Sequence, residues 1–218
     1  MAARSPERRR AVAPSTDGLA TTANRILDVA ERLVQARGFN AFSYADIAAT
    51  LRITKSSLHY HFPTKTDLGT HLTARYAARF LLALDDISHA HASAPERLRG
   101  YIALYEGMLR EDRACLCGML ATEFVTLAEP IRAALRFFFD GKDVWLTAVL
   151  ETGRGQGDLR FSGAALDVAR TLVATLGGAM MLARFRGDAA CFDNATQRLL
   201  GSLCIHGGGA AETSSPHT

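Results

Sequence analysis

The sequence has few cysteines and no long apolar segment, and both absences limit the class of protein. It contains 4 cysteines in 218 residues, and the pair in Cys115-Leu116-Cys117 does not suit the disulfide framework of a small secreted protein. No segment reaches the roughly 18 uninterrupted apolar residues of a membrane helix, and no apolar segment follows the N-terminal arginines, as it would in a signal peptide. We therefore expect a cytoplasmic protein with no membrane partner.

Composition argues against disorder. Hydrophobic residues make up 48% of the chain and charged residues 22%, which is ordinary for a globular protein. A chain of this length is long enough for one large domain or two small ones.

The net charge is small, +3, but it is unevenly distributed. Residues 1–65 contain 10 Lys and Arg against 5 Asp and Glu, and residues 66–218 contain 15 against 17, so the two parts carry +5 and −2. This asymmetry is typical of a protein in which one module contacts a polyanion, with nucleic acid as the leading candidate. Arginines 8–10 in a flexible tail account for part of the excess.

Strand-like alternation is not evident, and the sequence predicts an all-α protein. After the first 18 residues, prolines occur at positions 63, 95, 130 and 216, beside expected helix starts or in the C-terminal segment. Residues 1–18 and 207–218 have no apolar periodicity, so we expect two mobile tails.

The first part of the chain predicts three short helices and one long helix. An amphipathic helix over about residues 21–37 ends at Gly38. Ser43 and Asp46 have the spacing of a capping box, as do Thr64 and Asp67 before the long helix, and Thr54 is suited to cap a helix over 55–62.

Residues 44–51, 52–54 and 55–62 have the layout of a helix-turn-helix, the unit that places its second helix in the major groove of DNA. Leu58 and Phe62 are one helical turn apart and are expected to face inward. Polar and basic residues are left on the outward side, at a helix N-terminus that favours phosphate or base acceptors. These outward residues are Lys55, Ser56, Ser57, His59 and Tyr60.

The same region resembles the DNA-binding domain of the tetracycline-repressor (TetR) family of transcription regulators. The resemblance covers about residues 22–70 and rests on Gly38-Phe39, the segment from Ser43 to Ala48, the segment from Ile53 to Phe62, and the segment from Lys65 to Leu68. It implies a three-helix DNA-binding domain over residues 19–65 and a helical bundle for effector binding and dimerisation over residues 66–206. It also implies these DNA-contacting residues: Ser43, Tyr44, Thr54, Lys55, Ser56, Ser57, His59, Tyr60, His61 and Lys65.

Two positions depart from the family pattern. Arg52 stands in the turn where the family usually has glycine, which requires another turn geometry or a strained left-handed backbone. His59 stands where the family usually has tyrosine, and its smaller ring could lose a phosphate contact or make it sensitive to pH. A structural role is the alternative for Tyr60 and His61, which could pack the third helix against the fourth.

Beyond residue 70 the sequence predicts longer amphipathic helices. Their aromatic and thioether side chains are of the kind that lines apolar ligand cavities, although a plain hydrophobic core would have the same composition. We expect an effector pocket for a small apolar or aromatic molecule. Its candidate residues are Tyr101, Tyr105, Met108, Cys115, Cys117, Met119, Phe124, Phe137, Phe138 and Trp145.

The last two helices are the candidate dimer interface. Small residues in the middle of a helix need a packing reason, such as the close approach of another helix, and the resemblance implies a homodimer built from these helices. A twofold dimer favours a palindromic operator. The candidate interface residues are Leu172, Leu176, Gly177, Met180, Leu199 and Leu203.

The expected function is a DNA-binding repressor that a small effector releases from its operator, without enzymatic activity, metal or cofactor. One alternative is a repressor that senses electrophiles or oxidants through Cys115 or Cys117, since Arg113 nearby could lower a thiol pKa. Another is a metal protein or enzyme with ligands among Cys115, Cys117, His71, His89 and His91, although their spacing does not suit a zinc site. A helical interaction module, which would show no salt-dependent DNA affinity, is the third.

Overall fold

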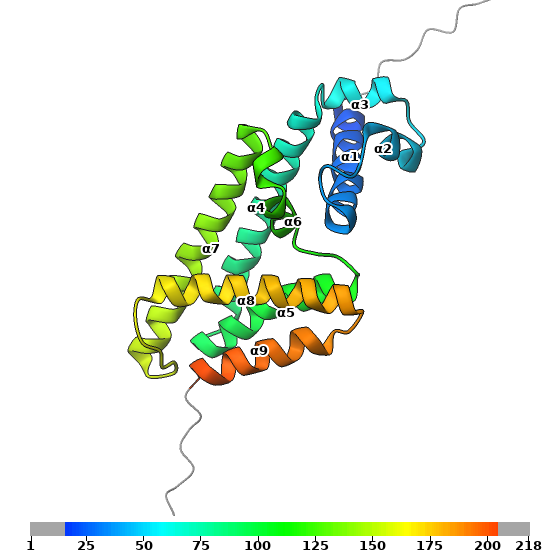
Figure 1. Cartoon of the computed structure of the whole chain (residues 1–218). Coiled ribbons are helices and arrows are strands. Elements are labelled where there is room, and N and C mark those ends of the chain that lie inside the picture. The colour runs from blue at the N-terminus through cyan, green and yellow to red at the C-terminus, as the bar shows by residue number, and fades with distance from the viewer. Residues whose placement is uncertain (1–15, 205–218) are drawn as a thin grey trace, which may run out of the picture.

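The computed structural model describes residues 16–204, which form nine α-helices, one 3-10 helix and no β-strand (Figure 1). The all-α prediction is therefore confirmed. The predicted tail 207–218 lies outside the described residues, as does the predicted tail 1–18 except for its last three residues. Those three belong to α1 (Thr16–Arg37), which begins earlier than the sequence pattern predicted.

α1, α2 (Tyr44–Leu51) and α3 (Lys55–His61) form the N-terminal domain, with the predicted caps. The Ser43 backbone N–H and hydroxyl both donate to the Asp46 carboxylate, at 2.7 and 2.8 Å. The Thr54 hydroxyl oxygen accepts from the Ser57 backbone N–H at 3.1 Å. These local bonds satisfy backbone donors that a helix start leaves unpaired, and so they set where α2 and α3 begin.

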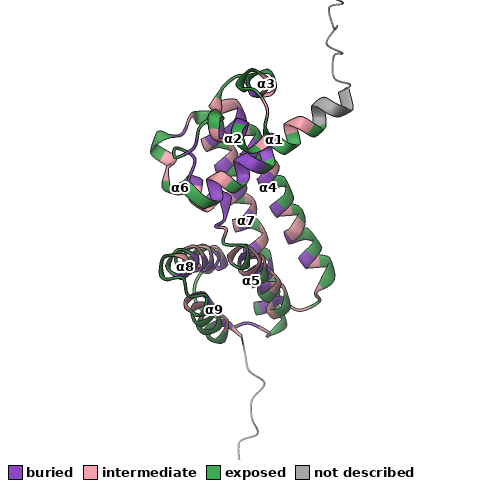
Figure 2. Cartoon of the chain, turned by 90° about the vertical axis from the view of Figure 1, so that its right-hand side faces the viewer, coloured by how far each residue is buried: buried purple, intermediate pink, exposed green. Residues whose placement is uncertain are grey.

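α4 (Lys65–Ala90) joins the two domains and lies beside α7 (Glu129–Gln156) (Figure 1). α5 (Ala94–Arg110), the short α6 (Leu116–Thr122) and the 3-10 helix η1 (Phe124–Thr126) connect them. α8 (Ala165–Arg186) packs on α7, α5 and α9 (Ala190–Leu203). Buried residues gather where the helices face one another (Figure 2), and they form one continuous core.

α8 has the length and apolar composition of a membrane-spanning helix, a test that core helices of water-soluble proteins also pass. One side of α8 is buried within the chain, whereas Met181, Leu182 and Phe185 are exposed. The high hydropathy of α8 therefore arises from two apolar sides, one buried in the core and one on the protein surface.

Polar contacts at two places tie the DNA-binding domain to the effector domain. The buried carboxylate of Glu31 on α1 accepts from Arg79 at 2.6 and 2.7 Å and from Arg75 at 3.3 Å, both on α4. At the end of α1, the Asn40 backbone N–H donates to the Glu123 carboxylate at 3.0 Å. Gly38 permits this approach because it has a φ of 90° and the Glu123 carboxylate lies where a side chain would begin.

Candidate functional site

Most of the outward side of α3 is exposed in the described chain, although the His59 ring also contacts Tyr44 and Pro63. Leu58 and Phe62 are buried, at 0% and 4% exposure, as the sequence predicted, and they hold α3 against its own domain. Lys55, Ser56 and His59 are exposed, and Tyr60 is 70% exposed. The alternative role of Tyr60 as a packing residue between α3 and α4 is therefore wrong.

Tyr44 and Lys65 use their polar groups inside the domain. The Tyr44 hydroxyl shares its proton between the carbonyl oxygens of Phe62 and Thr64, at 2.8 and 2.6 Å. The Lys65 ammonium donates to the Phe42 carbonyl at 2.5 Å and lies over the Phe42 ring at 4.4 Å. Burial raises the pKa of Tyr44 to about 12, helped by the Asp67 carboxylate, and lowers the pKa of Lys65. In this structure both side chains bond to the backbone of their own domain, and so they hold in place the segments that carry the outward surface of α3.

The other predicted DNA-contacting residues lie around the same surface. Ser43 and Thr54 cap α2 and α3, Ser57 and His61 are half-buried, and the His59 ring lies 3.0 Å from the Pro63 carbonyl oxygen through Nδ1. A shallow hollow of about 420 Å³ between α2 and α3 is lined partly by Ser43, Lys55 and His59. The structure thus brings cations and small polar groups together at one end of the domain.

Arg52 adopts the strained left-handed backbone, which is one of the two geometries expected for a non-glycine residue in this turn. Its φ is 55° and its ψ is 43°, and its N–H bonds back to the last carbonyl groups of α2. A side chain in this conformation costs roughly 1–2 kcal/mol. Its side chain is exposed at the turn between the two helices.

In the effector domain, the predicted pocket residues Tyr101, Tyr105 and Phe138 are almost fully buried. Together with Phe80 they make ring contacts at centroid distances of 5.1 to 6.4 Å. These rings fill the interior that they were expected to surround. The predicted cavity is, at this position, an aromatic core.

The centre of this aromatic core holds a lysine that the sequence analysis missed. Lys142 on α7 is 1% exposed, and its ammonium donates to the Tyr105 hydroxyl at 2.9 Å, which lies 3.0 Å from the Tyr101 hydroxyl. It lies 5.0 Å from the Phe138 ring centroid, within the range of a cation–π contact. Burial lowers the pKa of Lys142, and the neighbouring thiols of Cys115 and Cys117 oppose this shift. The sequence signal was its position one turn after Phe138 and one turn before Leu146, in an otherwise apolar stripe.

The remaining predicted pocket residues are spread over several places. Trp145 donates from its indole N–H to the Ser88 hydroxyl at 2.8 Å, and Phe137 is exposed. Phe124 lies under the guanidinium groups of Arg132 and Arg136, and Met119 packs at the edge of the core. Met108 lines a hollow beside α1.

Cys115 and Cys117 are both buried thiols. The Tyr76 hydroxyl donates to the Cys115 sulfur at 3.5 Å, and burial raises the pKa of Cys117 well above its ordinary value. Within residues 16–204, no group of three His, Cys, Asp or Glu side chains is arranged to hold a metal ion. The five ligands of the metal alternative, including His71, His89 and His91, are therefore not brought together.

The candidate dimer residues are divided between the core and the surface. Leu172, Leu176, Met180 and Leu203 are buried within the single chain, so a second copy cannot contact their side chains in this conformation. Gly177 and Leu199 are partly exposed. The side of α8 that remains available includes Ala174, Gly178, Leu182 and Phe185, and a side chain at Gly178 would meet no atom of its own chain.

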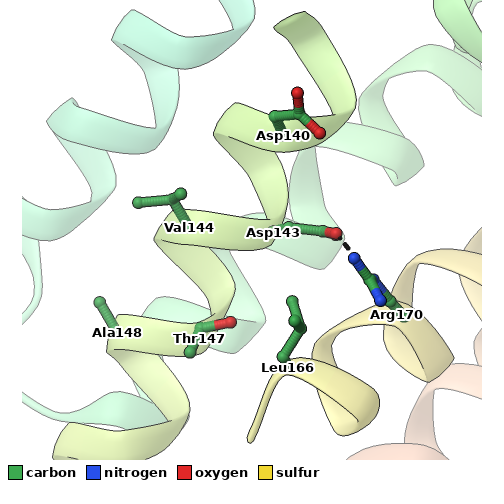
Figure 3. A pocket seen from close by; sticks show the side chains of 7 residues that line it. All are labelled: Asp140, Asp143, Val144, Thr147, Ala148, Leu166 and Arg170. Carbon is green, nitrogen blue, oxygen red and sulfur yellow. Dashed lines mark hydrogen bonds and ion pairs between the residues drawn. The ribbon is translucent and has the colours of Figure 1, made fainter. Parts of the chain in front are cut away.

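A further hollow of about 510 Å³ lies between α7 and the start of α8 (Figure 3). Its wall is mostly apolar, with Val144 and Leu166 among the lining residues. Across it, Arg170 donates to the Asp143 carboxylate at 2.9 Å. It opens on the outer surface of the chain.

Comparison with known proteins agrees with this arrangement. Residues 26–70 match the family described as bacterial regulatory proteins of the tetR family, and residues 94–199 match the tetracyclin repressor-like C-terminal domain. The chain is 25% identical to the Escherichia coli (strain K12) HTH-type transcriptional repressor NemR over 181 residues, which is 80% of this chain and 89% of NemR.

Solved structures show the same fold over most of the chain. A TetR-family transcriptional regulator from Agrobacterium tumefaciens has 36% identity and a TM-score of 0.84, covering 86% of this chain and 100% of its own. A TetR regulator from Legionella pneumophila has 31% identity and a TM-score of 0.76, covering 88% and 98%. Reduced NemR has 25% identity and a TM-score of 0.74, covering 84% and 98%. With both domains matched in sequence and in fold, the chain belongs to the TetR family of transcriptional regulators.

Proposed function

We propose that this regulator is a cytoplasmic repressor, which binds a palindromic operator as a homodimer and leaves it when a small, largely apolar or aromatic effector binds the C-terminal domain. The observation that supports this proposal most directly is the exposed side of α3. Lys55 and Tyr60 face away from the protein there, while the buried Leu58 anchors the helix. Side chains on such a face reach base edges and phosphates.

The dimer is supported by the apolar surface of α8. Leu182 and Phe185 are 54% and 86% exposed, and Gly178 on the same helix leaves room for a close neighbour. Exposed apolar side chains gathered on one helix are typical of an interaction surface. A twofold arrangement places two copies of α3 about one DNA turn apart, roughly 34 Å.

The proposal is tested with duplex DNA selected from a random library by the full-length protein. Lys55→Ala and Tyr60→Ala should each weaken operator affinity about tenfold, the equivalent of roughly 1.4 kcal/mol for a lost base or phosphate contact. Affinity should fall steeply with salt as phosphate contacts release counterions. Arg160→Ala, an exposed cation in the effector domain, is the matched control. Equal affinity of all four proteins would reject the assignment of α3.

A thiol sensor is the second candidate for the release step. Cys115 is the N-cap residue of α6, and it contacts Tyr76 at the edge of the hollow beside α1. Its burial opposes reactivity. If this candidate is right, Cys115→Ala should abolish operator release by N-ethylmaleimide while Cys191→Ala, which removes a more exposed thiol, should leave it intact.

A further inference from the structure

The surface between the two domains contains a hollow of about 210 Å³. It lies where α1 of the DNA-binding domain meets α4 and α5 of the effector domain. Its apolar wall consists of Tyr76, Phe80, Leu104 and Met108. Drug-sized ligands occupy sites of roughly 300 Å³ or more, so this hollow suits a molecule about the size of a single ring.

Two polar residues that line this hollow each have a buried side-chain atom without a partner. Gln35 is 1% exposed, and its Oε1 has no hydrogen-bond partner. The Nε of Arg113 is likewise buried without a partner, although its guanidinium also pairs with Glu111. An unsatisfied buried polar atom is costly. The Nε–H of Arg113 needs an acceptor such as a carboxylate oxygen, whereas Oε1 of Gln35 needs a donor, which a carboxylate lacks.

Two guanidinium groups and one carboxylate line the hollow, and each guanidinium already pairs with a carboxylate, Arg79 with Glu31 and Arg113 with Glu111. A ligand anion would bind by competing with these carboxylates. Among the residues that line this hollow, Glu31 is the one with a carboxylate, and both oxygens of that carboxylate already accept from Arg79. Arg113 and the half-exposed Arg79 face the same hollow. A carboxylate there would meet two guanidinium groups, which bind carboxylates in pairs of charge-assisted hydrogen bonds.

We propose that the hollow between α1, α4 and α5 binds a small aromatic carboxylate, with its ring on Tyr76 and Leu104 and its carboxylate on Arg113 and Arg79. This inference rests on the proposed repressor function, and it gives that function an effector class and site. By drawing Arg79 away from Glu31, the ligand loosens the tie between α1 and α4. The DNA-binding domain is then held less firmly, and operator affinity falls.

The experiment titrates benzoate into the full-length protein without DNA, by isothermal calorimetry. Acetate supplies the charge without the ring, and benzyl alcohol supplies the ring without the charge. Saturable binding of benzoate at one site per chain, at least tenfold tighter than either probe, is expected. Acetate loses the apolar burial of the ring, and benzyl alcohol loses the charged hydrogen bonds of the carboxylate.

Two variants and one control locate the site. Arg113→Met should weaken benzoate binding at least tenfold, and Leu104→Trp should fill the hollow and abolish binding. Arg110→Met removes an exposed guanidinium three residues from Arg113 and should change nothing. Undiminished binding in both site variants, or equal binding of benzoate and either probe, would overturn the proposal.

Operator binding is measured separately, with and without benzoate. Release by benzoate in the wild type but not in Arg113→Met is the expected result. If the protein does not bind DNA without benzoate, the repressor function fails, whereas normal DNA binding with no calorimetric signal contradicts only the ligand site.

Discussion

At the scale of single residues, Arg52 has a strained left-handed backbone at a position beside the proposed DNA-contacting surface. The turn between α2 and α3 requires a left-handed residue, and the φ of 55° is one that glycine adopts without a steric penalty. The exposed guanidinium at this turn lies beside the surface proposed to contact DNA. Retaining arginine here is consistent with a phosphate contact that offsets the strain.

Replacing Arg52 separates strain from contact. Arg52→Gly should raise the free energy of unfolding by about 0.5–1 kcal/mol, because the left-handed cost of 1–2 kcal/mol is partly offset by the greater entropy of an unfolded glycine. Arg52→Ala keeps the strain and should not stabilise. Urea denaturation measures both. If the guanidinium contacts phosphate, operator affinity falls equally in the two variants.

The buried ammonium of Lys142 is the other residue whose environment conflicts with its chemistry. Aromatic rings surround it, and its ammonium donates to the neutral Tyr105 hydroxyl. Its lowered pKa means that, between the folded value and the ordinary 10.5, the unfolded chain holds more protons. Stability contributed by this residue therefore increases as pH rises through that window.

Lys142→Met should remove this dependence. At pH 7 the variant should be more stable by about 1–3 kcal/mol, since well-packed apolar side chains often replace buried charges at a gain. The difference from the wild type should shrink as the pH rises from the folded pKa of Lys142 towards 10.5. Chemical denaturation at several pH values between 7 and 10.5 measures it. A difference that stays constant up to pH 10.5 would show that folding does not lower the pKa of Lys142.

At the scale of elements, α1 and α4 are joined by a buried carboxylate. Glu31 is 5% exposed and accepts from two arginines of α4, whereas Asp28 pairs with Arg75 at 2.8 Å on the surface. Buried charges are costly to leave unpaired, and exposed pairs contribute little. Among the ion pairs between α1 and α4, the buried pairing of Glu31 is therefore expected to contribute most to stability.

Glu31→Gln keeps the volume of the side chain and removes its charge. We expect it to reduce the free energy of unfolding by about 1–3 kcal/mol, at the low end of buried pairs because Arg79 is half-exposed and remains solvated. Asp28→Asn is the control and should cost less than about 1 kcal/mol. Thermal and urea unfolding measure both; equal losses would show that the buried pair has no special role.

At the scale of the whole molecule, the outer surface of α8 is the proposed dimer interface. A charge there would be buried without a partner in the dimer but solvated in the monomer. Leu182→Glu should therefore shift the protein towards monomers and weaken operator affinity more than about tenfold, since an unpaired buried charge costs several kcal/mol.

Sedimentation velocity measures this shift. Leu82→Glu is the matched control, because Leu82 on α4 is 63% exposed, close to the 54% of Leu182. The control should leave the assembly unchanged. A dimer that survives Leu182→Glu and is lost in Leu82→Glu would place the interface on α4 instead.

The sequence by itself determined the local structure of the DNA-binding domain. The capping pairs and the inward side of α3 depend on residues within one or two turns of each other, so short spacing is enough to predict them. The sequence left the turn geometry at Arg52 open.

Only the tertiary structure decided what distant helices do to one another. Helical periodicity identifies residues that share a side, but not which neighbour that side meets. For this reason the aromatic residues expected to line a pocket fill the core, Lys142 lies among them, and Leu172 and Leu176 face their own chain and not a partner. The hollow beside α1 likewise exists because residues from three helices meet there, at separations that no local pattern encodes.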